Sequence, residues 1–148
     1  MARQVRELGL NVQILGGDTI LGNPKFVELA GKDIEGAILA TVFIPSEDTP
    51  GISDFVKAYR ERFKELPDPW AGQFYDAVGI IYEAVKANNN EPDPRKIGEF
   101  TRGLSSPEKA YSGLLGRVYF DKAGDGSWPP VVAQIVSATP PRWKLLNR

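Results

Sequence analysis

Residues 12–18 end a short apolar run in two glycines and a carboxylate, reading Val-Gln-Ile-Leu-Gly-Gly-Asp. In α/β proteins ligands gather at the carboxyl ends of strands, where an acid on a glycine turn can reach a small polar ligand. We therefore interpret Asp18, with its neighbours Gly17 and Thr19, as part of a ligand-binding site. The alternative is that Asp18 only caps the turn or the following helix, and the residues alone leave both interpretations open.

Trp70 is a second candidate, because it stands in the first turn of the most apolar helix that the sequence predicts. Its ring could form the wall of a pocket or fill a core, and the residue type suits both roles. Tyr75 and Tyr82 on the same helix are expected to pack with their hydroxyls on polar partners.

Two further segments resemble ligand loops but lack the required chemistry. Residues 17–24 have the glycine spacing of a phosphate loop, yet Asn23-Pro24 replaces the lysine and hydroxyl that hold phosphate and magnesium. Residues 121–126 have acids at two positions of a calcium loop, but Ala123 replaces the third ligand and Val132 the closing glutamate. The sequence therefore predicts no nucleotide, metal or other cofactor.

Composition excludes several classes of function. The 148 residues include no histidine and no cysteine, which removes Ser/His/Asp and Cys/His nucleophiles, ordinary zinc sites and disulfides. No pair of acids suits general acid/base work, so a small α/β hydrolase or transferase is disfavoured and we expect no enzyme. A net charge of -1 gives no basic field for nucleic acid. No apolar run is long enough for a membrane span, and the N-terminal residues predict an amphipathic helix instead of a signal peptide.

The first third of the chain predicts helices that flank a sheet. A helix over residues 2–8 should end at Gly9, and Asn23-Pro24 should open a helix that ends at Gly31. Residues 36–43 are continuously apolar, which predicts a strand covered on both faces of a parallel sheet.

Three more helices are predicted where a capping residue precedes proline. They start at Thr49-Pro50, Asp68-Pro69 and Asp93-Pro94 and end near Leu66, Asn88 and Arg102. The first is amphipathic, whereas the second needs cover on most sides. Their apolar stripes are Phe55, Tyr59, Phe63 and Leu66 in the first, and Trp70, Phe74, Val78, Ile81 and Val85 in the second.

The last part of the chain changes to the period of two that is typical of strands. Residues 117–120 and 131–136 predict a hairpin whose turn includes residues 121–126. Residues 139–143 contain two prolines and predict an irregular tail.

The order and spacing of several segments resemble the amino-acid-binding proteins of ATP-driven branched-chain amino-acid uptake systems, which have the type I periplasmic-binding-protein fold. The resemblance covers most of the chain and is carried by residues 2–10, 14–18, 26–31, 35–37, 55–60, 75–78 and 118–121.

The resemblance implies the C-terminal half of a two-lobed α/β protein, with a mostly parallel sheet flanked by helices and a C-terminal β-hairpin. Residues 1–46 and 112–148 would belong to the second lobe. The three helices in residues 47–111 would cover the first lobe of an intact relative. Without that lobe, the apolar stripes would be exposed, so we expect the helices to fold back on the chain's own sheet or to be covered in a homodimer.

The resemblance also implies that Asp18 holds the ammonium group of an amino acid and that Trp70 lies against its side chain. The partners would be that small-molecule ligand and the membrane permease of an ABC transporter, in the periplasm or outside the cell. Because the first-lobe contacts are absent, we expect weak binding or none by the chain alone. The alternative is a structural or self-associating remnant that binds no solute.

Overall fold

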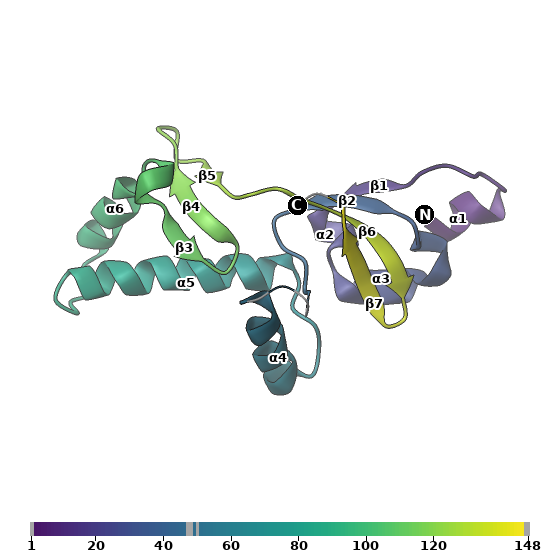
Figure 1. The fold of residues 1–148 in the computed structure, drawn as a ribbon, viewed down its shortest axis with the longest axis horizontal. Coiled ribbons are helices and arrows are strands. Elements are labelled where there is room, and N and C mark those ends of the chain that lie inside the picture. Colours follow the sequence, from purple (N-terminus) through teal and green to yellow (C-terminus); the bar gives the residue numbers. More distant parts are fainter. Residues whose placement is uncertain (1, 47–48, 50, 147–148) are drawn as a thin grey trace. The chain divides into compact units, whose positions relative to one another are not determined.

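The computed structural model describes residues 2–46, 49 and 51–146 and divides into two compact units (Figure 1). The first unit comprises Met1–Trp70 and Pro130–Arg148, and the second comprises Ala71–Pro129. This division differs from the predicted lobe boundaries at 46/47 and 111/112, which refer to an intact relative and stay a prediction.

The described strands of the first unit form one sheet in the order β1-β2-β6-β7. Its strands are β1 (Leu15–Gly17), β2 (Ile38–Thr41), β6 (Val131–Ala138) and β7 (Pro141–Leu145). The β1–β2 pair is parallel, as predicted, but the β2–β6 and β6–β7 pairs are antiparallel. The predicted α/β class is confirmed, whereas a mostly parallel sheet is wrong for the described strands, because β6 lies between β2 and β7 and runs antiparallel to both.

Two helices of the first unit begin and end within a residue of where the sequence predicts. Helix α1 (Ala2–Glu7) is followed by Gly9 at a φ of 70°, and α3 (Pro24–Ala30) ends at Gly31 at a φ of 65°. The side chain of Asn23 accepts the backbone N–H of Phe26 at 3.1 Å, so the predicted cap is confirmed. A short helix, α2 (Asp18–Leu21), follows β1, and a 3₁₀ turn, η1 (Gly31–Ile34), follows α3.

A hydrophobic core forms where α3, η1 and the sheet pack together. Its buried members are Val27, Ile34, Ala37, Leu39, Ile44, Ala133, Ile135 and Ala138. Strand β2 buries Leu39 and Thr41 in alternation, whereas Ile38 is half-buried and Ala40 is exposed. The prediction of cover on both faces is therefore wrong at Ala40, because the described helices cover the Leu39 face.

The predicted hairpin between residues 117–120 and 131–136 is wrong. Asp121 accepts the backbone N–H groups of Ala123 and Asp125 at 2.8 and 2.9 Å, which closes the turn so that β5 (Gly126–Ser127) pairs with β4 (Gly116–Phe120). Two prolines then follow at 129 and 130, where no backbone N–H can continue the pairing.

The C-terminal hairpin consists of β6 and β7 instead. Pro141 is the first residue of β7, an edge strand, which is a position that tolerates proline. Trp143 packs against the core of the first unit. A C-terminal hairpin is therefore confirmed, but the prediction that residues 139–143 form an irregular tail is wrong.

Helix α4 (Ile52–Phe63) follows Gly51, and Ser53 donates its backbone N–H to the carbonyl oxygen of Thr49 at 2.9 Å. The predicted start at Thr49-Pro50 falls partly outside the described residues, because Pro50 is not among them. Its aromatic side chains Phe55, Tyr59 and Phe63 lie in a row, with ring centroids 5.8 and 4.5 Å apart. Phe43, which precedes the helix, extends the row, because its ring centroid is 6.0 Å from that of Phe55.

The second unit packs helices against a small antiparallel sheet. Helix α5 (Pro69–Ala87) continues into this unit, and α6 (Pro94–Gly103) starts at Asp93, whose side chain accepts the backbone N–H of Arg95 at 2.7 Å. A 3₁₀ turn, η2 (Pro107–Lys109), leads to β3 (Tyr111–Gly113), which pairs with β4. Figure 1 shows β3 and β4 lying along α5, and Ile80, Leu104 and Val118 form the buried core between them.

The side of α5 that packs inward is not the predicted apolar stripe. Asp76, Ile80 and Ala84 are buried, whereas Phe74, Val78 and Ile81 are exposed. At these residues the predicted apolar stripe therefore does not form the core of the second unit.

Candidate functional site

Asp18 lies at the carboxyl end of β1 as the first residue of α2, so its carboxylate is carried on a strand tip. Gly17 occupies the N-cap position of α2 with an extended backbone, so no side chain caps the helix. The hydroxyl of Thr19 donates to Oδ1 of Asp18 at 3.3 Å. Asp18 is half-buried, and among the described residues no cation forms an ion pair with it. Its carboxylate oxygens can therefore accept hydrogen bonds from a ligand.

The simpler interpretation of Asp18 as a helix cap is not what the structure shows. The N-cap position of α2 belongs to Gly17, and Asp18 stands one residue inside the helix. Its carboxylate accepts from Thr19 and not from a backbone N–H in the described residues. Asp18 is thus half-buried, and its side chain does not cap α2.

Gly22 brings the end of α2 against the start of α5. A Cβ at position 22 would lie 2.7 Å from the carbonyl oxygen of Asp18 and 2.7 Å from Cγ of Pro69. Trp70 follows Pro69 directly and is 49% exposed, so it belongs to the surface and not to the core. The helix turn that carries Asp18 and the helix turn that carries Trp70 are therefore neighbours within the first unit.

An apolar groove of about 770 Å³ lies beside the same strand. It is formed by α1, β1, α2 and α3, and Leu15, Gly16 and Ile20 line the part nearest to Asp18. This groove is not predictable from the sequence, because its lining comes from elements whose packing only the fold defines.

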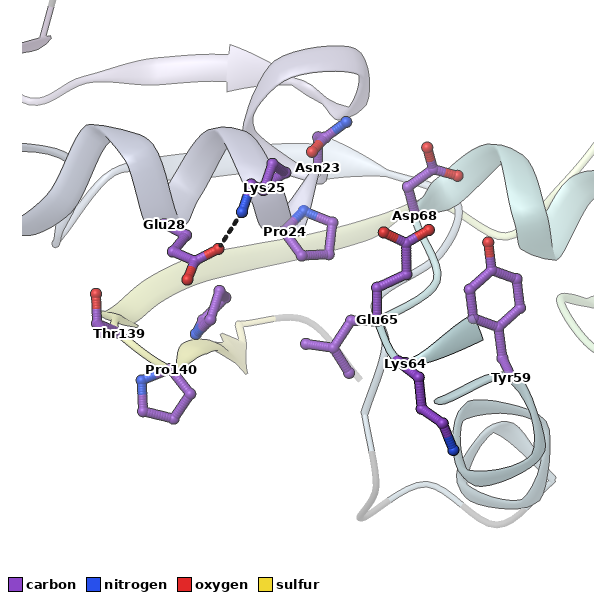
Figure 2. Close-up of a pocket in the computed structure, with 12 residues that line it drawn as sticks. Asn23, Pro24, Lys25, Glu28, Tyr59, Lys64, Glu65, Asp68, Thr139 and Pro140 are labelled. Atoms are coloured by element: carbon purple, nitrogen blue, oxygen red, sulfur yellow. Dashed lines mark hydrogen bonds and ion pairs between the residues drawn. The ribbon is translucent and has the colours of Figure 1, made fainter. Parts of the chain in front are cut away.

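A second cavity of about 710 Å³ lies between α3, the end of α4 and the turn from β6 to β7 (Figure 2). Tyr59 lies on the same side of it as Glu65 and Asp68, and the pKa of its hydroxyl is raised by burial and then by these two carboxylates. Lys25 forms an ion pair with Glu28 at 3.2 Å, one turn further along α3 on the same wall of the cavity. None of the predicted site residues lines this cavity, which has a mixed charge pattern that favours no single ligand class.

The structure reveals one buried acid whose role the sequence analysis missed. Asp76 is only 1% exposed, and its two carboxylate oxygens accept the backbone N–H groups of Leu114 and Leu115 at 2.6 and 2.9 Å. Its pKa is raised because burial outweighs the opposing effect of these two hydrogen bonds. An acid among apolar helix residues was the signal in the sequence, but the hydrogen bonds that it accepts come from the loop between β3 and β4.

Other site types find no support in the part of the chain that the structure describes. No three or more acidic side chains gather there to hold a metal ion. The described helices include none that is both long and apolar enough to cross a membrane.

Comparison with known proteins places this geometry in a family. The family model described as periplasmic binding protein matches residues 1–139, and the chain therefore belongs to that family. The fold is the type I periplasmic-binding-protein fold, as the resemblance implied. None of the curated proteins that were compared matches the chain.

Three solved structures are similar over almost the whole chain. A leucine-binding protein, LivK, from Thermotoga maritima is 26% identical with a TM-score of 0.77, covering 99% of this chain and 39% of its own. A putative branched-chain amino-acid ABC transporter protein from Rhodospirillum rubrum is 25% identical with a TM-score of 0.73, covering 98% and 40%. LivJ from Streptococcus pneumoniae, solved with isoleucine, shares the fold at 19% identity and a TM-score of 0.78, covering 99% and 40%. The chain thus spans about 40% of the length of these relatives.

Proposed function

We propose that this chain is an amino-acid-binding module of an ABC-type uptake system, acting in the periplasm or outside the cell with a membrane permease as its partner. The observation that carries the proposal is the half-buried carboxylate of Asp18 at the tip of β1, beside the helix turn of Trp70. Family membership, a similar leucine-binding protein and a similar protein solved with isoleucine support the ligand class.

In this proposal Asp18 accepts the ligand's ammonium group, because a charged hydrogen bond between ammonium and carboxylate is among the stronger polar contacts. The Thr19 hydroxyl orients the carboxylate through its bond to Oδ1, and Gly17 lets the ligand approach the backbone closely. The ring of Trp70 lies against an apolar side chain of the ligand. A carboxylate of the ligand would need donors from the lobe that longer relatives possess, so the chain alone binds weakly.

Calorimetric titration with L-leucine, L-isoleucine and a polar amino acid such as L-glutamine tests this function. We expect leucine and isoleucine to bind at about millimolar Kd, equivalent to about -4 kcal/mol, and glutamine more weakly. Asp18→Asn should abolish the heat signal, because the amide cannot neutralise an ammonium group. Asp54→Asn is the matched control, since Asp54 also lies in the first turn of a helix and should leave binding unchanged.

The competing function is a self-associating remnant that binds no solute, and the exposed apolar residues of α5 favour self-association as such. We therefore also propose that two copies associate through the helices within residues 50–103. Absence of leucine heat at several millimolar, in a folded sample, would favour the remnant. Equal leucine binding by Asp18→Asn would instead remove Asp18 from the site.

A further inference from the structure

The carbonyl oxygen of Gly36 accepts hydrogen bonds from two side-chain amides that come from different strands. Nε2 of Gln13 donates to it at 2.8 Å, and Nε2 of Gln134 donates to it at 3.1 Å. A carbonyl oxygen has two lone pairs, so these two bonds use both of them. Gln13 lies just before β1 and Gln134 lies in β6, so the turn before β2 is joined to the strands on both sides of β2.

The Gln13 amide also joins the two segments at which the pairing of β1 with β2 begins. The same nitrogen donates to the carbonyl oxygen of Ile14 at 3.1 Å, and that oxygen accepts the backbone N–H of Ile38 at 3.0 Å. Both N–H bonds of the amide are therefore used. One goes to the chain that leads into β1, and the other goes to the turn that leads into β2.

The turn that receives the Gln13 amide is itself fixed on β6. The N–H of Gly36 donates to the carbonyl oxygen of Ile135 at 2.8 Å, and the N–H of Ile135 donates to the carbonyl oxygen of Ala37 at 2.9 Å. Strand β2 then pairs with β6 over four residues. The turn and β2 therefore keep their place without Gln13, and Gln13 ties β1 to this fixed point.

Strand β1 has little in its own sequence to determine its register. It consists of the three residues Leu15–Gly17, and two of them are glycines. Register is specified by side chains that fit one face of a sheet, so a short strand rich in glycine is prone to slip along its neighbour. A slip by one residue would move the end of β1 by about 3.3 Å and turn the strand over.

The register of β1 determines where the carboxylate of Asp18 lies. Gly17 is opposite Ala40 in the parallel pair, and Asp18 begins α2 directly after it. A displacement of about 3.3 Å is longer than a hydrogen bond, so a slipped strand would carry the carboxylate away from a ligand that other residues hold.

We propose that Gln13 is a positioning residue, which fixes the register of β1 on β2 and thereby places the carboxylate of Asp18. Gln13 acts from the opposite end of the strand and does not contact the ligand. The effect on binding rests on the proposed role of Asp18, whereas the register of β1 depends on no ligand.

Amide hydrogen exchange, measured by NMR on the isotope-labelled full chain, tests the register. Gln13→Leu keeps a side chain of similar size and removes both donors, so the Ile38 amide should exchange about fivefold faster, as expected for the loss of one hydrogen bond. The Ile135 amide should exchange at the wild-type rate, because its bond to Ala37 does not involve Gln13. Unchanged exchange of Ile38, or equal acceleration of Ile38 and Ile135 through a loss of overall stability, would overturn the inference.

Gln134→Leu is the matched control variant. It removes the other amide from the same carbonyl oxygen and leaves Gln13 in place, so the Ile38 amide should exchange at the wild-type rate. Acceleration of Ile38 by Gln134→Leu as large as that by Gln13→Leu would mean that the Gly36 carbonyl matters and not the tie to β1.

Calorimetric titration with L-leucine is the second measurement. Gln13→Leu should raise the leucine Kd at least twofold, because neighbouring registers lower the fraction of chains that can bind. Faster exchange of Ile38 with an unchanged leucine Kd would refute the placement of Asp18 by Gln13. If the wild type gives no leucine heat while Gln13→Leu still accelerates Ile38, solute binding fails and the role of Gln13 in the register stands.

Discussion

Gly113 lies directly against the carboxylate of Asp76, so closely that a Cβ at 113 would clash with Oδ1. This contact lets the loop after β3 present the backbone N–H groups of Leu114 and Leu115 to the buried acid. Asp76 thereby joins α5 to the β3–β4 sheet within the second unit.

Gly113→Ala should lower the free energy of unfolding by about 2 kcal/mol or more, because the new methyl group must displace a buried carboxylate that accepts two hydrogen bonds. Urea denaturation monitored by circular dichroism measures the change. Gly103→Ala is the control, since a Cβ there meets no atom within 4 Å and the residue lies in a helix, so alanine should be neutral or slightly stabilising.

Asp76→Asn should destabilise the protein by about 2 kcal/mol at pH 7, because one acceptor becomes an NH₂ group that faces a backbone donor. The raised pKa adds a pH dependence. A carboxyl whose pKa is higher in the folded than in the unfolded protein binds its proton better when folded, so it stabilises the fold as pH falls through that pKa.

The wild type should therefore gain stability relative to Asp76→Asn as the pH falls from 7 toward the ordinary aspartate pKa. Parallel urea titrations of both proteins at several pH values measure this difference. A wild-type advantage that shrinks on acidification would refute the raised pKa.

Gly22→Ala should weaken leucine binding without removing any proposed ligand contact. The methyl group would press on the Asp18 carbonyl oxygen and on Pro69, moving the turns that carry Asp18 and Trp70 apart. We expect at least a tenfold rise in the leucine Kd in calorimetry. Unchanged affinity in a folded variant would show that the two turns need not be held together.

Asp93→Ala should cost about 1 kcal/mol, because α6 loses the side chain that accepts two backbone N–H groups at its start. Thermal unfolding should show a lower Tm. Asp93→Ser should recover most of the loss, since a serine hydroxyl can also cap a helix. A Tm unaffected by alanine would mean that α6 frays without penalty.

Local signals predicted the helices well because their cause is local. Asn23-Pro24 and Asp93-Pro94 each combine a side-chain acceptor with a proline that needs no N–H partner, and both caps are confirmed. The strand partners were not predictable in the same way. Pro129 and Pro130 separate β6 from β4, its predicted partner, and β6 pairs instead with β2, which lies nearly a hundred residues earlier in the chain.

The candidate site was predicted in part. The glycine pair and Asp18 mark a strand end in the sequence, and the structure has β1 end there. The approach of Pro69 to Gly22 and the burial of Asp76 needed tertiary packing, since each joins residues that are tens of positions apart.

The amino-acid sequence by itself determined where helices begin and end, which chemistries are absent for want of histidine and cysteine, and the resemblance that the family match confirms. Only the tertiary structure decided which side of α5 is buried. Both sides of that helix are rich in apolar residues, so periodicity alone did not choose between them. The hydrogen bonds that Asp76 accepts from the β3–β4 loop hold the side of Asp76 and Ile80 against the small sheet of the second unit.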